Sequence, residues 1–414
     1  MENNISNHNN TENKEFKTLL INPKNIFNSM SKKILKCSKT TLNISTEIID
    51  AILSENKDKL IKLSEKGLPD DLPILRALVW KINLGYLPIN SNLWEKTFIE
   101  KRKLYNLYKD MFIKQIEKER REKNYKNREI IEQILKDVSR TGQNFSFFFQ
   151  STNKNILFSQ EELLKMYKER RDCAFQNIDD YYLLEKENET HADVLTRILI
   201  IYSKFAPEIS YHQGMNEILA PIYYCYSYDK LYIEEKEEFI EADSFWSFFN
   251  LMSQMKMSFD EFVIDGNRSN TENLYLLLKI LDKDLVKHMD EYNIKFEFFA
   301  VRWFILLFSQ EFNIGEILRL WDVIFSCENV YYFTYYVALA VFQIKRNKLI
   351  ISDMVDFMVE IQNFENIEID DILELVWKIQ NKYENQFLEI ISKQKISDKG
   401  FITGGKIIYR RKTI

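Results

Sequence analysis

Along most of this chain, apolar residues recur at every third or fourth position, and no segment alternates steadily between apolar and polar residues. The first spacing places apolar side chains on one face of an α-helix, whereas steady alternation is typical of a half-buried β-strand. We therefore expect an all-α protein in which helices pack in succession. The predicted helical segments are 47–61, 75–80, 99–134 (one helix or two), 191–205, 215–228, 241–257, 273–289, 298–312, 315–325 and 331–345, with two more to about 391.

The polar positions divide the chain into one long domain and two tails. Residues 1–45 are rich in Asn, Ser and Lys and offer little apolar surface to bury, so we expect this segment to be disordered. A single helical domain then spans 46–391, with a polar insertion at about 150–189. Residues 392–414 form a basic tail that could contact anionic lipid, although most such tails stay solvated.

Composition supports a packed core and excludes several classes of site. Hydrophobic residues make up 45% of the chain, with 30 Phe and 22 Tyr, whereas 9 Gly and 6 Pro disfavour sandwiches, barrels and glycine-rich nucleotide loops. The net charge of -5 gives no general case for nucleic-acid binding. The cysteines lack metal-ligand spacing, so we expect reduced thiols and neither a zinc site nor a disulfide framework. They are Cys37, Cys173, Cys225 and Cys327.

Neither export nor membrane insertion is expected. The chain begins with a polar segment that lacks the apolar stretch of a signal peptide. Its longest uncharged apolar run, 330–344, is shorter than the ~20 residues that a membrane-spanning helix needs. We therefore expect a soluble protein inside the cell.

The first segment with candidate chemistry is 134–141. Asp137 and Arg140 lie three positions apart and share one face of the predicted helix. Asp137 can hold Arg140 by a charge-assisted hydrogen bond, and we expect Arg140 to emerge where the helix ends at Gly142. The plain alternative is an ordinary surface arginine at a helix C-terminus, and taken alone this pattern is weak.

The second segment is 211–216, expected to form a loop between two apolar helices. Gly214 permits a sharp turn, while Tyr211 and Met215 can be buried and so fix the loop. Gln213 is then left pointing outward, with Asn216 placed to bond the loop backbone. The alternative is a helix connection whose polar residues only cap, but six specified positions in a row make this signal the stronger of the two.

An arginine and a glutamine together suit one kind of chemistry. Arginine stays protonated in proteins and serves as a permanent counter-charge, while a glutamine amide can only orient and donate or accept hydrogen bonds. Such a pair can position a water molecule and neutralise developing negative charge, as phosphoryl transfer to water requires.

Other classes of catalytic site lack support. His212 has no Ser, Cys or Asp partner at readable spacing, so we interpret it as a loop histidine. No phosphate-binding loop occurs, because 404–406 lacks both the earlier glycine and the following Ser or Thr of that motif. If the chain acts on a nucleoside triphosphate, another protein must hold the nucleotide.

At this point the chain resembles the TBC domain of Rab GTPase-activating proteins, over roughly residues 60–385. Short stretches such as 216–224 and 308–312 are most similar to the subgroup called TBC domain family member 13. One departure is Ala77, where the family usually has glycine, and we expect it to affect packing only. The matching elements, in family order, are 67–69 with 76–80, then 134–140, then 211–216, then Trp303 with 319–322.

The resemblance implies a mechanism with two residues supplied to a Rab. Arg140 would act as an arginine finger that neutralises charge on the transferring phosphate, and Gln213 would orient the attacking water in place of the Rab's own glutamine. An arginine finger is worth about 10³ to 10⁵ in rate. The residues that would support the two fingers are Asp137, Tyr211, Gly214 and Asn216.

The same resemblance implies the partners and setting. The partner would be a GTP-bound Rab, which would carry the GTP and Mg²⁺, so this chain would need no cofactor and would act as an enzyme activator in vesicle trafficking. We expect a cytoplasmic monomer, associated with endomembranes through the Rab, with peripheral membrane contact possible through the basic tail. The main alternative is a Rab-binding effector or scaffold without turnover, against which the intact Arg140 and Gln213 argue. A helical-repeat adaptor is disfavoured because no repeat of 20 to 50 residues is visible.

Overall fold

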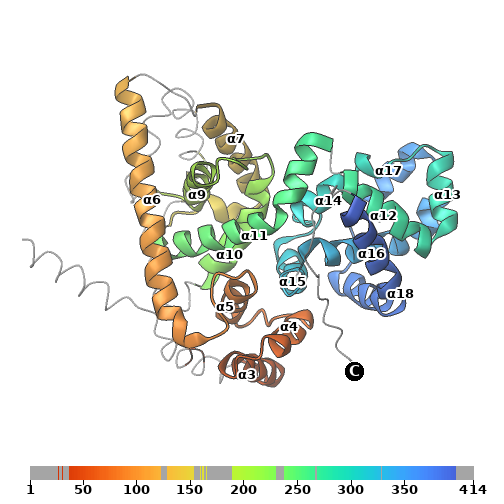
Figure 1. The fold of residues 1–414 in the computed structure, drawn as a ribbon, viewed down its shortest axis with the longest axis horizontal. Coiled ribbons are helices and arrows are strands. Elements are labelled where there is room, and N and C mark those ends of the chain that lie inside the picture. The colour runs from red at the N-terminus through yellow and green to blue at the C-terminus, as the bar shows by residue number, and fades with distance from the viewer. Residues whose placement is uncertain are drawn as a thin grey trace, which may run out of the picture. The chain divides into compact units, whose positions relative to one another are not determined.

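The computed structural model of the chain is helical throughout its described parts, which are residues 27, 30, 37–122, 128–152, 159, 161–162, 165, 189–229, 237–265, 268–327 and 329–397. Within these ranges the β pairing is limited to an isolated bridge between Ser151 and Thr190, and there is no strand (Figure 1). The expected all-α class is therefore confirmed. No helix in the same ranges is long and apolar enough to cross a membrane.

The described residues group into two compact units, one within 1–260 and 302–334 and the other within 261–301 and 335–414. Helices α11, α14 and α16 contribute to both. The elements of the first unit, with α11, α14 and α16 in full, are α3 Lys39–Leu53, α4 Lys57–Glu65, α5 Pro73–Asn83, η1 Ser91–Leu93, α6 Trp94–Glu122, α7 Arg128–Asn144, η2 Ser146–Phe149, α9 His191–Phe205, α10 Met215–Asp229, α11 Glu237–Asp265, α14 Ala300–Leu306, α15 Ile314–Ile324 and α16 Val330–Leu349. Those of the second are α12 Arg268–Leu281, α13 Lys283–Glu291, η5 Phe296–Phe298, α17 Met354–Gln362 and α18 Ile369–Ser397.

The helical region extends beyond both predicted ends of the domain in the sequence. Helix α3 begins at Lys39, inside the segment predicted to be disordered, because the Ser38 side chain caps it by accepting a hydrogen bond from the Thr41 amide at 3.1 Å. The Thr41 hydroxyl in turn donates to the Asp71 carboxylate at 2.9 Å. Helix α18 continues past 391 to Ser397. The predictions for residues 1–26, for 398–414 and for most of the insertion at 150–189 lie outside the described residues.

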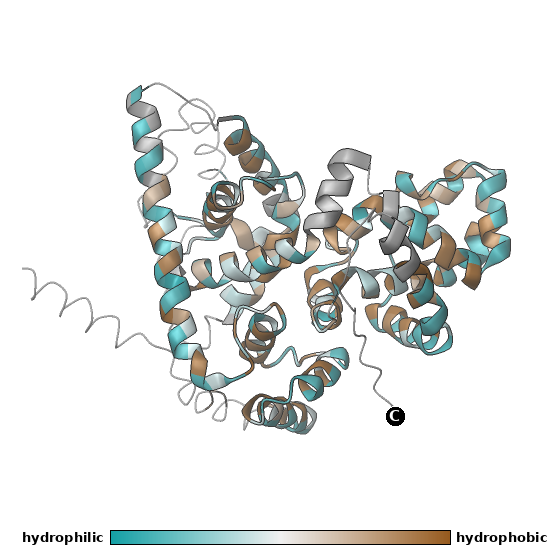
Figure 2. Ribbon diagram, in the orientation of Figure 1, coloured by the Kyte–Doolittle hydropathy of each residue, from teal (hydrophilic) through white to brown (hydrophobic). Residues whose placement is uncertain are grey.

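Two predicted helices are shorter than expected for local reasons. The segment 273–289 is divided at Asp282, whose side chain caps α13 by accepting from the Leu285 amide at 3.0 Å. Helix α14 ends at Leu306, because Leu307 and Phe308 have φ angles of 48° and 61° and cannot continue a right-handed helix. The predicted charged segment 99–134 forms the pair α6 and α7, and Figure 2 shows largely hydrophilic residues along α6.

A buried carboxylate joins sequence motifs from both ends of the first unit. Asp322 of α15 is fully buried and accepts hydrogen bonds from Arg76 Nε at 3.0 Å, Trp80 Nε1 at 2.8 Å and the Leu68 amide at 3.0 Å. Close to it, Gly67 has φ +91° and lies against the Arg319 guanidinium, so that an added Cβ would come within 2.7 Å of Arg319 Cζ. These motif residues therefore act as fold determinants.

Two further carboxylates, both on α11, hold the helices around the site in place. Glu241 accepts from Arg197 of α9 at 2.7 Å, and Asp243 accepts from Arg102 of α6 at 2.8 Å and lies 3.0 Å from Lys81 Nζ of α5. Burial raises the pKa of each carboxyl, but the neighbouring cations outweigh it and leave both pKa values at about 2. Each carboxylate is therefore paired as well as buried.

Candidate functional site

The structure brings the two predicted segments together in the first unit, where α7, α9 and α10 pack against one another. The Asn216 side chain, at the start of α10, donates through Nδ2 to Thr141 Oγ1 at 2.7 Å and to the Asp137 carbonyl at 3.3 Å. Asn216 is 3% exposed, so these bonds are shielded from water. The loop before α10 is thus fixed to the last turns of α7, not merely to itself.

One carboxylate supports both segments. Asp137 is 3% exposed, and its Oδ1 accepts from Arg140 Nη1 at 3.3 Å. Its Oδ2 accepts from the Tyr211 hydroxyl at 2.9 Å and from Gln133 Nε2 at 2.9 Å. Because Tyr211 belongs to the loop that carries Gln213, the positions of Arg140 and Gln213 are set through the same side chain.

Arg140 is presented from a continuous helix. Its side chain is 63% exposed, whereas the neighbours Ser139 and Thr141 on the same turn are buried. The prediction that the helix ends at Gly142 is wrong, since α7 continues to Asn144. Burial of Thr141 against Asn216 favours the continued turn over a glycine C-cap. Arg140 therefore points outward because of its place on the helical face and not because the helix stops.

The loop before α10 leaves Gln213 exposed, because the glycine after it permits a turn and the methionine that follows is anchored in the core. Gly214 has φ +99°, a backbone conformation that favours glycine, and an added Cβ would also have to displace the end of the Leu306 side chain, whose Cδ2 would lie 2.7 Å away. Met215 is completely buried, and its Sδ accepts from the His212 amide at 3.4 Å. The loop therefore has an anchored base and a glutamine at its tip.

Tyr211 remains a hydrogen-bond donor over the whole physiological range. Burial, together with the negative charge of Asp137, raises the pKa of its phenol far above the usual value. Its hydroxyl also lies 3.1 Å from Asn216 Oδ1, which completes a closed set of bonds around the base of the loop. This explains why a tyrosine with its hydroxyl serves the loop better than a phenylalanine would.

The sequence patterns do not predict three residues that support the site, namely Gln133, Thr141 and Glu217. Glu217 Oε1 accepts from Thr141 Oγ1 at 2.6 Å and from Asn216 Nδ2 at 2.8 Å. Burial raises the pKa of the Glu217 carboxyl, while the bond from Thr141 opposes that rise. Gln133 lies one helical turn before Asp137, and that spacing is the sole sequence signal that could have indicated it.

The site offers an exposed cation and an exposed amide, and little else that reacts. Within the described ranges there is no group of three His, Cys, Asp or Glu side chains arranged to hold a metal ion. Arg140 cannot act as a base, and Gln213 has no useful pKa. The arrangement is therefore suited to neutralising charge and orienting a small molecule on a surface brought to it from outside.

Comparisons with known proteins identify the family and the fold. The family described as the Rab-GTPase-TBC domain matches residues 174–350, a range that includes Gln213 and begins after Arg140. TBC1 domain family member 13 of Homo sapiens is 29% identical over 383 residues, covering 80% of this chain and 94% of that protein. The Mus musculus protein of the same name is 30% identical with the same coverage. The crystal structure of the Ypt/Rab-GAP domain of Gyp1p shares the fold, with a TM-score of 0.60 and 23% identity, and the likeness covers 87% of this chain and 99% of that domain.

Proposed function

The chain belongs to the Rab-GTPase-TBC domain family, and we propose that it accelerates GTP hydrolysis by a Rab-family small GTPase, supplying Arg140 and Gln213 to the active site of its partner. The relatives named GTPase-activating protein, from several yeasts, support this class of activity. The observation that carries the proposal is the Asp137 carboxylate, which bonds Arg140 on one oxygen and Tyr211 of the Gln213 loop on the other.

The proposed roles follow from the chemistry of the two side chains. As the phosphoryl group transfers to water, negative charge spreads over its oxygens, and the Arg140 guanidinium would neutralise that charge. The Gln213 amide would accept a hydrogen bond from the attacking water, which fixes its direction of approach. Asp137, Tyr211, Gly214 and Asn216 would keep both side chains in register without touching the nucleotide.

The nucleotide would belong entirely to the partner. We propose that the GTPase carries GTP and Mg²⁺ and that this chain contributes no cofactor. We further propose that it acts in vesicle traffic as a monomer that the GTPase recruits to endomembranes.

The test is single-turnover GTP hydrolysis across a panel of GTP-loaded Rabs, followed by Gln213→Ala on the responsive one. If Gln213 orients the water, a Rab whose own catalytic glutamine is replaced by leucine should still be turned over by the wild-type chain. Gln213→Ala should lower the hydrolysis rate by at least about 10²-fold, typical of losing a group that acts in the transition state. Rab affinity should stay within a few-fold.

The scaffold alternative predicts a different result. A purely structural Gln213 would affect Rab binding and unfolding together, and a scaffold would bind Rab without any effect on hydrolysis. To separate these cases, the affinity for a Rab loaded with GDP and aluminium fluoride is measured for wild type and Gln213→Ala, together with the hydrolysis rate of each. Normal hydrolysis by Gln213→Ala would remove the glutamine from the mechanism.

A further inference from the structure

The glycine of the Gln213 loop lies against a side chain from the end of α14. Among the described residues, the atoms nearest to an added Cβ at Gly214, apart from its own chain neighbours, would be Cδ2 and Cγ of Leu306, at 2.7 Å and 4.0 Å. Leu306 is 6% exposed and belongs to the same compact unit as the loop. Its side chain therefore fills the space beside the residue that directly follows Gln213.

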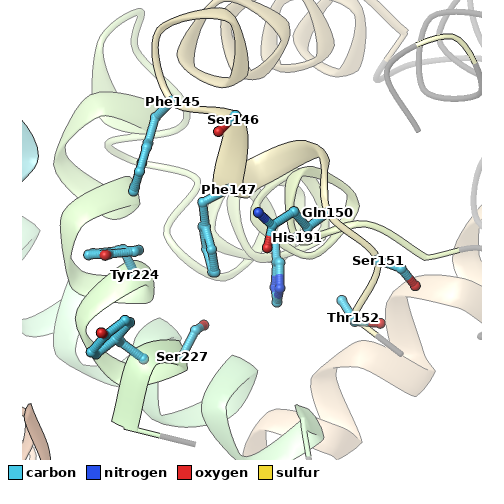
Figure 3. A pocket seen from close by; sticks show the side chains of 10 residues that line it. Phe145, Ser146, Phe147, Gln150, Ser151, Thr152, His191, Tyr224 and Ser227 are labelled. Atoms are coloured by element: carbon cyan, nitrogen blue, oxygen red, sulfur yellow. The ribbon is translucent and has the colours of Figure 1, made fainter. Parts of the chain in front are cut away.

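The two ends of α10 differ in what lies next to them. The C-terminal end borders a cavity of about 350 Å³, which is lined in part by Phe147, His191 and Tyr224 (Figure 3). Just before the N-terminal end, the Leu306 side chain occupies the space beside Gly214. Because packed side chains resist displacement, the Gln213 loop has less freedom on this side than a loop beside a cavity would have.

Leu306 is followed directly by an uncommon backbone turn. Leu307 and Phe308 have φ angles of 48° and 61°, which large apolar residues rarely adopt. Among the described residues they are the only consecutive pair of non-glycine residues with positive φ. Such conformations persist only where the surrounding structure enforces them, and they cluster at functional sites. The turn therefore marks a place where packing overrides the backbone preference of the sequence.

Two contacts in the core hold this turn. The Trp321 indole donates through Nε1 to the Leu307 carbonyl at 2.9 Å. The Phe308 ring stacks on that of Trp303, with the ring centroids 5.2 Å apart. All four of these side chains are completely buried. The backbone directly after Leu306 is thus fixed, so that Leu306 offers the loop a stationary surface.

The other end of the loop is fixed by different means. Ser210, directly before Tyr211, is also left-handed, with φ 57°. The Tyr211 hydroxyl then bonds Asp137 at 2.9 Å. Gln213 therefore lies between a polar anchor at Tyr211 and an apolar contact at Leu306.

We propose that Leu306 is a positioning residue for Gln213, because it limits how far the backbone of the loop can move and so determines where the Gln213 amide is presented. The inference rests on the proposed function, since Leu306 takes part in the reaction only through Gln213. A glutamine on a looser loop would spend less time in the orientation that directs the attacking water. The alternative is a leucine that stabilises the core and has no particular effect on the reaction.

The first measurement compares kcat and KM on a responsive Rab, with rates expressed per folded molecule. Leu306→Ala should lower kcat by roughly tenfold and leave KM within about twofold, because the loop remains but its amide is less well oriented. Leu306→Met, which refills the space, should keep kcat within about threefold of wild type.

Leu63→Ala is the matched control. Leu63 is 5% exposed and lies on α4, which packs against α3 and α15. Truncating it should cost stability on a similar scale, which urea unfolding measures, while kcat per folded molecule stays unchanged. The comparison therefore separates the loss of a buried leucine in general from the loss of the one beside the loop.

The second measurement asks whether Leu306 acts through Gln213. Leu306→Ala is combined with Gln213→Ala, and single-turnover hydrolysis is measured for all four members of the cycle. In the Gln213→Ala background, Leu306→Ala should change the rate by less than about twofold, because no amide is left to orient. Should Leu306→Ala not fold, Leu306→Val takes its place, with an expected kcat loss of about threefold and the same dependence on Gln213.

The outcomes separate this inference from the proposed function. A wild-type chain that activates no Rab would overturn both. An active wild-type chain whose Leu306→Ala variant keeps its kcat, or raises KM instead, would overturn only the role of Leu306. An equal loss of rate with and without Gln213 would also overturn it, because the leucine would then act on the fold and not through the glutamine.

Discussion

Two arginine–aspartate pairs of the first unit, Arg140–Asp137 and Arg76–Asp322, use the same chemistry for opposite purposes. Both carboxylates are buried, Asp137 with 3% and Asp322 with 0% of its side chain exposed. The arginines differ: the Arg76 side chain is 4% exposed and that of Arg140 is 63% exposed. The Arg76–Asp322 pair holds a cation inside the fold, and the Arg140–Asp137 pair holds one out toward solvent.

The two arginines differ in how many of their N–H groups donate hydrogen bonds within the protein. Arg76 donates to Asp322, to the Leu68 carbonyl at 2.7 Å and to Asp70 at 2.7 Å. Within the described part of the chain, Arg140 makes a single hydrogen bond of 3.3 Å, to Asp137. A guanidinium that keeps most of its donors is available to a ligand, whereas one that uses them all is structural. Substitutions at the two pairs should therefore separate activity from stability.

The largest effect is expected from Arg140→Ala. Loss of the cation should lower the rate of Rab GTP hydrolysis by about 10³-fold or more. The free energy of unfolding should change by less than about 1 kcal/mol, because Arg140 is exposed and the buried Asp137 carboxylate keeps its hydrogen bonds from Tyr211 and Gln133. Arg140→Lys should be almost as inactive, since lysine lacks the planar fork. Single-turnover hydrolysis and urea unfolding measure the two quantities, and activity within a few-fold of wild type would refute the assignment.

Asp322→Ala should show the reverse pattern. Removing this carboxylate leaves the buried Arg76 guanidinium with the solvent-exposed Asp70 carboxylate in place of its buried counter-charge, and such a change costs about 3–5 kcal/mol. Denaturant unfolding should therefore report a large loss, while the folded fraction keeps its kcat. Asp70→Ala is the control, because the Asp70 side chain is 85% exposed and its loss should cost less than about 1 kcal/mol. Equal effects of the two changes would contradict the structural role of Asp322.

Acid should weaken the buried pairs of α11. Glu241 and Asp243 have pKa values of about 2, below those of an unfolded chain, so their contribution is present above about pH 4. It is lost as the pH falls toward 2, and the loss should be on the order of a few kcal/mol. Glu241→Gln should lower the slope of unfolding free energy against pH in this window by up to ~1.4 kcal/mol per pH unit. Glu272→Gln, at an exposed position, should leave the slope unchanged.

The smallest effect concerns the bond between Thr141 and Glu217. Thr141→Val and Glu217→Gln should each reduce kcat/KM by roughly five- to tenfold, on the scale of ~1–1.5 kcal/mol for one hydrogen bond. The double variant should lose little more than either single one, because both remove the same link. Ser326→Ala combined with Glu217→Gln should be additive, since the Ser326 hydroxyl donates locally to the Val323 carbonyl and belongs to a different segment from the Thr141–Glu217 bond. Additivity at the Thr141–Glu217 pair would exclude the coupling.

Sequence periodicity predicts the fold well where local and tertiary signals agree. The helix predicted at 191–205 is confirmed at both ends, because Thr190 and Asp193 form a capping box at its start. It fails where backbone conformation is set by packing. Two left-handed residues end α14 at Leu306, and no pattern in the sequence indicates them. Likewise, Gly142 predicts a helix end from the sequence. The helix continues instead, because the buried Thr141 beside it is held by a hydrogen bond from Asn216.

The candidate site is predictable to the extent that its motifs are contiguous. Asp137 with Arg140 follows from helical spacing, and the loop at 211–216 follows from its glycine and flanking apolar residues. Glu217 was missed because its partner Thr141 is 76 positions away, and pairing across that distance leaves no local signal. The catalytic roles of Arg140 and Gln213 stay predictions, since geometry shows where side chains are held and not what they do.

The continuation of α7 through Gly142 also bears on the entropy of complex formation. A finger carried on an irregular loop would lose backbone freedom on entering a partner, at about 1–2 kcal/mol for each residue ordered. The backbone of Arg140 is already helical, so only its side-chain rotamers, worth at most ~2 kcal/mol, need to be ordered. Because no loop has to fold on binding, more of the favourable contact energy with the partner can stabilise the transition state.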